Sequence, residues 1–348
     1  MRSPARHAGR SSISRLSTRW CSSRRALPHQ ARRLRTVTTT RASIDDRSPS
    51  SGLRERARDR RAVHLQHAAP ALAHPQRAYW VRHPPQGRDV SAHRVQKRRG
   101  VICSSAGNHA QGVALAAKLN GMHAVVVMAE NATPSKVAAT RGYGAEVVLH
   151  GTIWDEANEK AKQLVVERGL TYIHPFDDPE LVAGQGTLGL EIHDDFPQAD
   201  VVVVPIGGGG LISGVSMALK AINPTVKIVG VESSGAPGMQ KSVEAGRVVT
   251  LDRVDCIIDG LRVKRVGDYT HAVVSRFVDE IVTLPDADIF DAVVWVMGHC
   301  KLVVEGAAAA PVAALLHDKI RAPAGSKVVC VLSGGNVNLD QLKGLRWN

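Results

Sequence analysis

Apolar residues beyond residue 100 fall into short runs that alternate with segments of helical periodicity. The continuous β-branched run Val201–Pro205 is typical of a strand buried on both faces. Further strands are predicted at 100–103, 124–128, 146–149, 172–174, 227–231 and 327–332, and helices at 108–119, 134–143, 154–168, 181–192 and 211–221. This alternation predicts an α/β fold in which parallel sheets are covered by helices.

The first 99 residues have a different pattern. Residues 52–99 are rich in Arg, His, Pro and Ala and show no sustained period of 2 or 3.6. Such a stretch has too few regularly spaced apolar side chains to bury one face, so we expect disorder or weak structure there. Residues 1–44 contain Arg and Ser throughout and no acidic residue, as in mitochondrial or plastid transit peptides. We expect a cytoplasmic protein, or a mitochondrial or plastid one if this segment is a transit peptide.

The positive charge is concentrated in the same terminal segment. The net charge is +13 over 348 residues, but residues 1–100 hold 24 basic and five acidic residues, whereas the remaining 248 hold 21 basic and 27 acidic ones. The globular part is thus mildly acidic, and the basic segment offers only Trp20, Tyr79 and Trp80 for stacking on bases. We expect no nucleic-acid partner. Because no apolar run approaches about 18 residues, we also expect no membrane span.

The cysteines give no sign of a metal site or a disulfide framework. Five are scattered along the chain, at Cys21, Cys103, Cys256, Cys300 and Cys330. Since no two have the CxxC spacing, we expect no structural zinc and no bound metal, and a reducing compartment fits better.

Glycine-rich turns follow two of the predicted strands, where α/β proteins bind ligands. The first contains Gly207, Gly208, Gly209 and Gly210, directly before the helix that is predicted to begin at Leu211. Residues without a Cβ let backbone N–H groups and a helix N-terminus approach an anion closely. An ordinary turn needs one or two glycines, so four in succession predict a phosphate-binding site.

Two other loops are ambiguous when taken alone. Ser333, Gly334 and Gly335 follow the strand predicted at 327–332, and residues 104–112 lead into the helix predicted at 108–119. Either loop can bind a ligand, but either is also what an ordinary turn or a helix N-cap contains.

Six short motifs occur in an order that resembles a known enzyme family. They are Ser105-Ala106-Gly107-Asn108-His109-Ala110-Gln111-Gly112, Gly184-Gln185-Gly186-Thr187, the four glycines, Asp259-Gly260, Val304-Glu305-Gly306-Ala307 and Ser333-Gly334-Gly335-Asn336. Over residues 100–348 the chain resembles the fold-type II (tryptophan synthase beta-like) enzymes that use pyridoxal 5′-phosphate (PLP) and, among them, the threonine/serine dehydratases. This implies two open, mainly parallel twisted sheets. A smaller lobe at 100–155 would carry the substrate loop, a larger lobe at 156–348 would bind the cofactor, and 1–99 would be an atypical segment.

The resemblance also implies a role for each motif. The PLP phosphate would be held by Gly207, Gly208, Gly209 and Gly210. Asn108 would bind the 3′-oxygen of the pyridine ring, and Glu305 would lie near the ring. Ser333 would bind the pyridine nitrogen. Leu211 and Gly334 would also contact the cofactor. The substrate carboxylate would be held by Ser105, Ala106, Gly107, Asn108 and His109.

The implied reaction is elimination of the β-hydroxyl from threonine or serine, which gives 2-oxobutanoate or pyruvate and ammonia. A neutral serine at the pyridine nitrogen does not hold the ring protonated, which suits β-elimination better than transamination. The resemblance further implies a homo-oligomer that acts on a small hydroxy-amino acid in amino-acid metabolism, such as isoleucine biosynthesis. Biosynthetic members often add a regulatory domain after the catalytic one, and we expect none in these 348 residues.

Related activities differ at single positions. Ala106 lies where serine racemases carry a second reacting serine, and a methyl group cannot deliver a proton. Gly238 lies where the racemase cation site needs a second acid after Glu232, so a metal is disfavoured and Glu232 is expected to be a structural or solvated acid. His109 lies where cysteine synthases usually have threonine.

The lysine that such enzymes require is missing. The family carries it in a Ser-Phe-Lys motif about two dozen residues before Ser105, and counting back reaches Tyr79 to Val81. Lys97 is the only lysine before Ser105, and we expect it to be a solvated side chain. The catalytic residue is therefore unassigned, because no other upstream amine can bind the cofactor aldehyde or remove the α-proton.

Two explanations of the missing lysine stay open. One is a pseudoenzyme that binds PLP or an amino acid without catalysis. The other is a shift of reading frame before about Gly100, which the enrichment in Arg, His and Pro with almost no Lys favours. An ammonia-lyase, impaired in the chain as written, is the main functional prediction, and a non-catalytic binding protein and a serine racemase-like enzyme are the alternatives.

Overall fold

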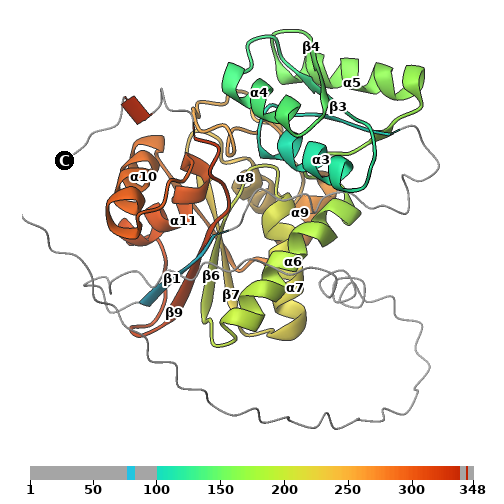
Figure 1. The fold of residues 1–348 in the computed structure, drawn as a ribbon. Coiled ribbons are helices and arrows are strands. Elements are labelled where there is room, and N and C mark those ends of the chain that lie inside the picture. The colour runs from blue at the N-terminus through green and yellow to red at the C-terminus, as the bar shows by residue number, and fades with distance from the viewer. Residues whose placement is uncertain (1–76, 83–99, 338–341, 344–348) are drawn as a thin grey trace, which may run out of the picture. The chain divides into compact units, whose positions relative to one another are not determined.

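The computed structural model describes residues 77–82, 100–337 and 342–343, and for 77–82 it describes the backbone. All of these residues belong to one compact unit, 47–348. Their strands form two sheets, each covered by helices (Figure 1). The transit-like segment 1–44 and Lys97 lie outside the described residues.

The larger sheet has five parallel strands in the order β1-β9-β6-β7-β8. They are β1 Arg77–Arg82, β6 Val201–Pro205, β7 Lys227–Ser233, β8 Glu280–Leu284 and β9 Lys327–Leu332. In the central strand β6, Val201 and Val203 pack into the core on one face, while Val202 and Val204 pack into the core on the other. The continuous β-branched run therefore forms a strand that is buried on both faces, as its pattern predicts.

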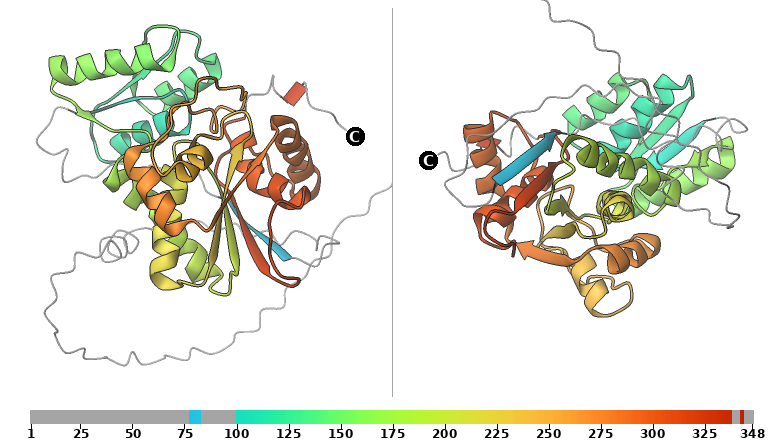
Figure 2. Two further views of the ribbon diagram at one scale, coloured as in Figure 1. Left: turned by 180° about the vertical axis from the view of Figure 1, so that it is seen from behind. Right: turned by 90° about the horizontal axis from the view of Figure 1, so that it is seen from below.

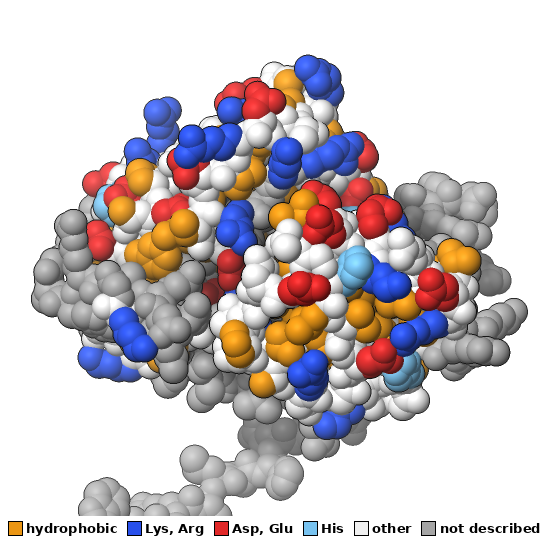
Figure 3. Space-filling model, turned by 90° about the horizontal axis from the view of Figure 1, so that it is seen from above, with side chains coloured by type: hydrophobic (Ala, Val, Ile, Leu, Met, Phe, Trp, Pro, Cys, Tyr) orange, Lys and Arg blue, Asp and Glu red, His pale blue; other side chains and the backbone are white. Residues whose placement is uncertain are grey.

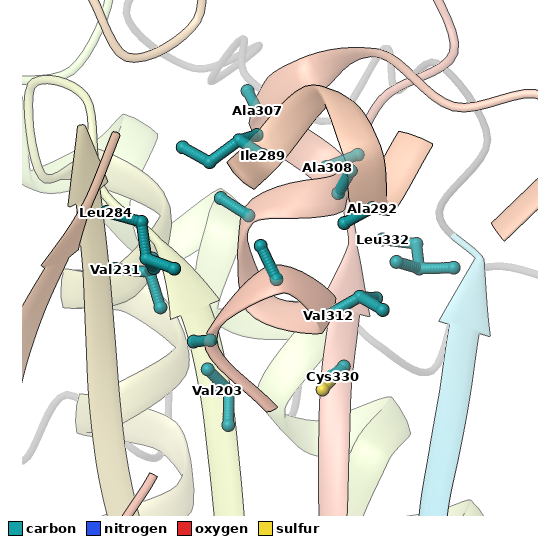
Figure 4. Packing of buried hydrophobic residues seen from close by; sticks show 14 of the residues in the cluster. Val203, Val231, Leu284, Ile289, Ala292, Ala307, Ala308, Val312, Cys330 and Leu332 are labelled. Atoms are coloured by element: carbon teal, nitrogen blue, oxygen red, sulfur yellow. The ribbon is translucent and has the colours of Figure 1, made fainter. Parts of the chain in front are cut away.

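Helices cover both faces of the larger sheet (Figure 2). On one face lie α10 (Asp286–Cys300) and α11 (Gly306–Leu316), and on the other α6 (Pro179–Asp195) and α7 (Gly210–Ile222). Figure 4 shows the small side chains of α11 packed over β6 and β9, where alanines allow the helix to approach the strands closely. Two shorter helices, α8 Gly238–Glu244 and α9 Asp268–Phe277, lie between β7 and β8 in the chain.

The smaller sheet has four parallel strands in the order β4-β3-β2-β5. They are β2 Val101–Ser104, β3 Ala124–Met128, β4 Glu146–Leu149 and β5 Thr171–Tyr172. Side chains of α3 (Asn108–Leu119) and α4 (Pro134–Gly142) pack on one face, and those of α5 (Trp154–Arg168) pack on the other. Helix α5 ends at Gly169, whose φ of 65° is in the left-handed region that favours glycine.

The α/β architecture with two parallel sheets confirms the predicted fold class. The smaller sheet continues past the predicted boundary at residue 155, because α5 packs on that sheet and β5 pairs with β2. We propose that the division between the lobes lies between Tyr172 and Pro179. The sequence pattern predicts disorder or weak structure for 52–99, and Arg77–Arg82 in this segment forms a strand beside β9. Strand β1 pairs with backbone groups of β9 that would otherwise lie at the edge of the sheet. The residues Tyr79-Trp80-Val81 have high β-propensity, which favours this strand.

The described surface does not carry the basic charge of the whole chain. Lys and Arg side chains alternate with Asp and Glu over the face shown in Figure 3. Within 100–337, no helix combines the length and the apolar character that a membrane span needs.

Candidate functional site

The site is built at the carboxyl ends of parallel strands, where α/β folds bind ligands. Strand β2 leads into the loop before α3, β6 leads into the four glycines, the last of which begins α7, and β9 leads into the turn that begins at Ser333. Glu305 lies directly before α11. Hydrogen bonds between these loops join residues that are about 200 positions apart in the chain.

A hydrogen-bonded cluster centres on Asn108. Its Nδ2 donates to Glu305 Oε1 at 2.6 Å, and its Oδ1 accepts from Asn336 Nδ2. The backbone N–H of Glu305 donates to the carbonyl oxygen of Gly334 at 3.1 Å. The structure thus brings together three of the predicted cofactor-binding residues, Asn108, Glu305 and Gly334, and it adds Asn336, for which no role is predicted from the sequence.

Burial sets the ionisation of Glu305. Loss of solvent raises the pKa of this carboxyl group, while the hydrogen bond from Asn108 and the charge of Lys136 lower it in part. A Cβ on Gly334 would lie 2.1 Å from Glu305 Oε1, so a side chain there would displace the Glu305 carboxylate from its place beside Asn108. The neighbouring Ser333 is partly buried at the end of β9.

Two of the four glycines illustrate why the loop after β6 admits no side chain. A Cβ on Gly208 would lie 2.2 Å from the ring of Phe176, and one on Gly207 would lie 2.3 Å from the carbonyl oxygen of Gly260. Gly209 has a φ of 95°, which side chains disfavour. The glycine loop is therefore packed tightly against Phe176 and Gly260.

The N–H groups of the same loop fit a phosphate. Within 100–337, no protein acceptor takes the N–H of Gly207, Gly208, Gly209 or Gly210. These groups lie at the N-terminus of α7, where the helix dipole favours an anion. Leu211 is in the first turn of α7, and its side chain packs against the core. Four unused donors at a helix N-terminus fit the phosphate of the predicted cofactor.

The predicted substrate loop precedes α3. Ser105 N–H donates to Val127 O at 3.2 Å, and Ser105 Oγ accepts from the N–H of Gly107 at 3.2 Å. No side chain caps the first turn of α3. His109 Nε2 lies 3.2 Å from Ile173 O, so a role of His109 in binding a carboxylate rests on its backbone N–H.

Lys136 and Asp259 form an ion pair that sequence reasoning missed. Lys136 Nζ is on α4, which packs on the smaller sheet, and Asp259 precedes Gly260, which packs against the four glycines. The pair lines one small pocket together with Glu305 and Asn336. The motif Asp259-Gly260 has no predicted role. The sequence around Lys136 is that of an ordinary surface lysine, because its partner Asp259 is 123 residues away in the chain.

Both carboxylate oxygens of Glu232 accept hydrogen bonds from backbone N–H groups of the protein. Its Oε1 accepts from Met239 N at 2.8 Å, and its Oε2 accepts from Gln240 N at 2.9 Å. Burial raises the pKa of this carboxyl group to about 7. Over the residues that the structure describes, no cluster of His, Cys, Asp or Glu is arranged to hold a metal ion.

The position predicted for the cofactor-binding lysine lies in β1. Val81 pairs with Val331, two residues before Ser333. The counted-back position is therefore near the carboxyl end of β9, where several of the predicted cofactor-binding residues gather, and the sequence has no lysine there.

Known proteins resemble this chain over most of its length. A family described as pyridoxal-phosphate dependent enzyme matches residues 68–334. An L-threonine ammonia-lyase of Thermotoga maritima is 47% identical over 247 residues, which are 71% of this chain and 61% of that protein. The chain thus spans about three fifths of the length of that relative.

Solved structures agree with the sequence comparison. A threonine deaminase from T.th. has a TM-score of 0.74 at 34% identity, over 83% of this chain and 98% of that one. Maize serine racemase has a TM-score of 0.75 at 32% identity, over 85% of this chain and 94% of that one. The family match, these relatives and a glycine loop that fits a phosphate agree, and the chain belongs to the family of pyridoxal-phosphate dependent enzymes.

Proposed function

We propose that residues 100–337 form the site of a PLP-dependent lyase that converts L-threonine to 2-oxobutanoate and ammonia, or L-serine to pyruvate and ammonia. The observation that carries the proposal is the convergence of three features at the carboxyl ends of parallel strands. These are the N–H groups of the four glycines, which have no acceptor among residues 100–337, the Asn108–Glu305 pair and the turn at Ser333. The names of the Thermotoga maritima relative and of the T.th. structure support threonine as the substrate.

The protein would hold the cofactor at three points. The four glycine N–H groups would bind its phosphate, and Asn108, oriented by Glu305 and Asn336, would donate to its 3′-oxygen. Ser333 would offer a neutral hydrogen-bond partner to the pyridine nitrogen. Bound in this way, PLP supplies an electron sink for the α-carbon of an amino acid. A ring that is not held protonated favours departure of the β-hydroxyl over transamination.

The substrate carboxylate would bind at the start of α3. No side chain caps the start of this helix, and the helix dipole favours an anion there. Ser105 Oγ accepts from Gly107 N–H and can donate its own proton to the carboxylate. Ala106 brings no further proton donor, which supports elimination over racemisation.

We further propose that the chain as written binds the cofactor but is impaired in catalysis, because it has no lysine between residues 1 and 96. Removal of the α-proton needs a base within hydrogen-bond reach. A reading-frame shift before Gly100 would explain a complete site downstream of Ser104 beside a missing lysine upstream.

Trapping and activity assays separate these claims. After incubation with PLP and borohydride, we expect no modified lysine at Lys97 in the full chain, and a trapped Lys97 would overturn the proposed impairment. Transcript sequence across the codons for residues 40–110 would supply the N-terminal region to be tested. If the version with that region, now carrying a lysine, forms no 2-oxo acid from threonine or serine, the lyase proposal fails.

A racemase-like activity is the second candidate. The similarity to maize serine racemase favours it, and Ala106 opposes it. Chiral analysis of serine after incubation with the same lysine-containing version decides between them, because accumulation of D-serine faster than pyruvate would favour the racemase. We also propose a homo-oligomer, which light scattering of the purified chain would test.

A further inference from the structure

Asp177 caps a helix that is distant in the sequence. Its Oδ1 accepts from the N–H of Tyr269 at 3.0 Å and of Thr270 at 3.1 Å, and its Oδ2 accepts from Asp268 N–H at 3.1 Å. These donors belong to the first turn of α9, whose own N-cap residue, Gly267, supplies no side-chain bond. The carboxylate thus satisfies three N–H groups that a helix otherwise leaves without partners.

The capped helix holds the phosphate-binding loop through Thr270. The Thr270 side chain is fully buried, and its Oγ1 donates to the carbonyl oxygen of Gly208 at 2.7 Å. The carbonyl of Gly208 and the N–H of Gly209 belong to one planar trans peptide, so they point in opposite directions. Fixing this carbonyl against Thr270 therefore turns the Gly209 N–H away from α9, and no protein acceptor between residues 100 and 337 takes it.

The residue before Asp177 contacts the same loop. The ring of Phe176 lies where a Cβ of Gly208 would be, and its backbone lies 3.1 Å from the Cβ position of Gly210. The loop between β5 and α6 therefore touches the glycine loop directly through Phe176 and indirectly through Asp177 and α9. The next residue, Asp178, instead caps its own helix, α6, by accepting from Glu180 N at 2.7 Å and Leu181 N at 3.2 Å.

We propose that Asp177 is a positioning residue for the phosphate-binding loop, acting through the first turn of α9 and the Thr270–Gly208 hydrogen bond to direct the Gly209 N–H to the cofactor phosphate. The proposal rests on the proposed cofactor site. Asp177 itself does not touch the cofactor in this arrangement.

The test uses the full chain and pyridoxine 5′-phosphate, which has the phosphate and the ring but no aldehyde, so its binding needs no lysine. We expect Asp177→Ala and Thr270→Val to weaken binding in calorimetry about tenfold or more, the effect of one lost hydrogen bond in a buried site. Alanine is used because an asparagine oxygen would still accept from the N–H groups of the helix. Thr270→Ser keeps the hydroxyl and should bind as the wild type does. Asp178→Ala is the matched control, which should lower the melting temperature without weakening binding. The ³¹P resonance of the bound ligand should shift in Asp177→Ala and Thr270→Val only.

Each contrary result has a distinct meaning. If the wild type binds pyridoxine 5′-phosphate and Asp177→Ala binds it equally well, the positioning role is wrong and the cofactor site stands. If Asp178→Ala weakens binding as much as Asp177→Ala does, the effect is a general loss of stability and the positioning role is again wrong. If Asp177→Ala does not fold, the comparison of Thr270→Val with Thr270→Ser decides, and equal affinities of these two variants overturn the proposal. A wild type that does not bind overturns both this proposal and the cofactor site.

Discussion

Gly208 shows how closely single residues constrain the site. Its carbonyl accepts from Thr270, and the place where a Cβ would lie is filled by the ring of Phe176. Its N–H has no protein acceptor in the described part of the chain. One residue without a side chain therefore serves core packing and also presents an N–H group to the proposed cofactor site.

Gly208→Ala should lower the free energy of unfolding by about 1–3 kcal/mol, because the new methyl group overlaps Phe176 and forces it to move. Gly298→Ala, in α10, is the control. No atom lies within 4 Å of its Cβ position, so this change should raise the free energy of unfolding by about 0.5–1 kcal/mol. Urea unfolding of the three proteins measures both effects, and a neutral Gly208→Ala would contradict the packing described for this loop.

Glu305 should make stability depend on pH. Because burial raises its pKa in the folded state, its contribution to stability is complete below the pKa of an unfolded glutamate and is lost as the pH rises through the folded value. Glu305→Gln has no carboxyl group to ionise, so it does not lose this stability. The melting temperature of Glu305→Gln minus that of the wild type should therefore increase as the pH rises from about 4 to about 8. Thermal unfolding at several pH values tests this, and a constant difference would show that the carboxyl is not perturbed.

At the scale of elements, the loop between β5 and α6 depends on the protonation of His174. Its Nδ1 accepts from the N–H of Phe176 at 3.2 Å and of Asp177 at 2.8 Å, which requires an unprotonated Nδ1. Burial lowers the pKa of His174, an effect that the charge of Asp177 opposes and that of His109 reinforces. The loop that carries Asp177 is thus held by a neutral histidine.

Acid should loosen this loop. The stabilisation by His174 is present above the pKa of an unfolded histidine and is lost as the pH falls through the lower folded value. In the wild type, hydrogen exchange at Phe176 and Asp177 should therefore accelerate below that pH, beyond the intrinsic change of the exchange rate. In His174→Asn, the amide oxygen can replace Nδ1 as acceptor without titrating, so the extra acceleration should disappear. Equal acceleration in both proteins would rule out this role of His174.

The elements differ in how far the sequence predicts them. The helix Asn108–Leu119 and the strand Val201–Pro205 have the predicted bounds, because amphipathic periodicity and β-branched runs are local signals. The helix Gly306–Leu316 is not predicted, since it is apolar on nearly all sides and contains Pro311. The first turn of α9 is capped by Asp177, about 90 residues away, which no local window can show.

The site, like the elements, has features that the sequence predicts and features that only the folded chain shows. The order of the motifs along the chain singles out Asn108, Glu305 and Gly334 before the structure shows that they lie together, and their roles toward the cofactor stay predictions. The Lys136–Asp259 ion pair and the capping by Asp177 could not be predicted, because each joins residues that only the folded chain brings together.

At the scale of the whole molecule, the Lys136–Asp259 pair joins the parts built on the two sheets and also acts on Glu305. The charge of Lys136 lowers the pKa of Glu305, and that of Asp259 raises it. Lys136→Met should therefore raise the pKa of Glu305, and Asp259→Asn should lower it. Carboxyl ¹³C NMR titration of the two variants measures these shifts, and shifts of the same sign would contradict the geometry.

The most direct test of the account is a calorimetric titration of the full chain with pyridoxine 5′-phosphate, which needs no lysine to bind. We predict one saturable site per chain, lost or weakened by more than about tenfold in Gly208→Ala and retained in Gly298→Ala. Absence of saturable binding in the wild type, or equal binding by Gly208→Ala, would contradict the claim that the glycine loop after β6 holds the cofactor phosphate.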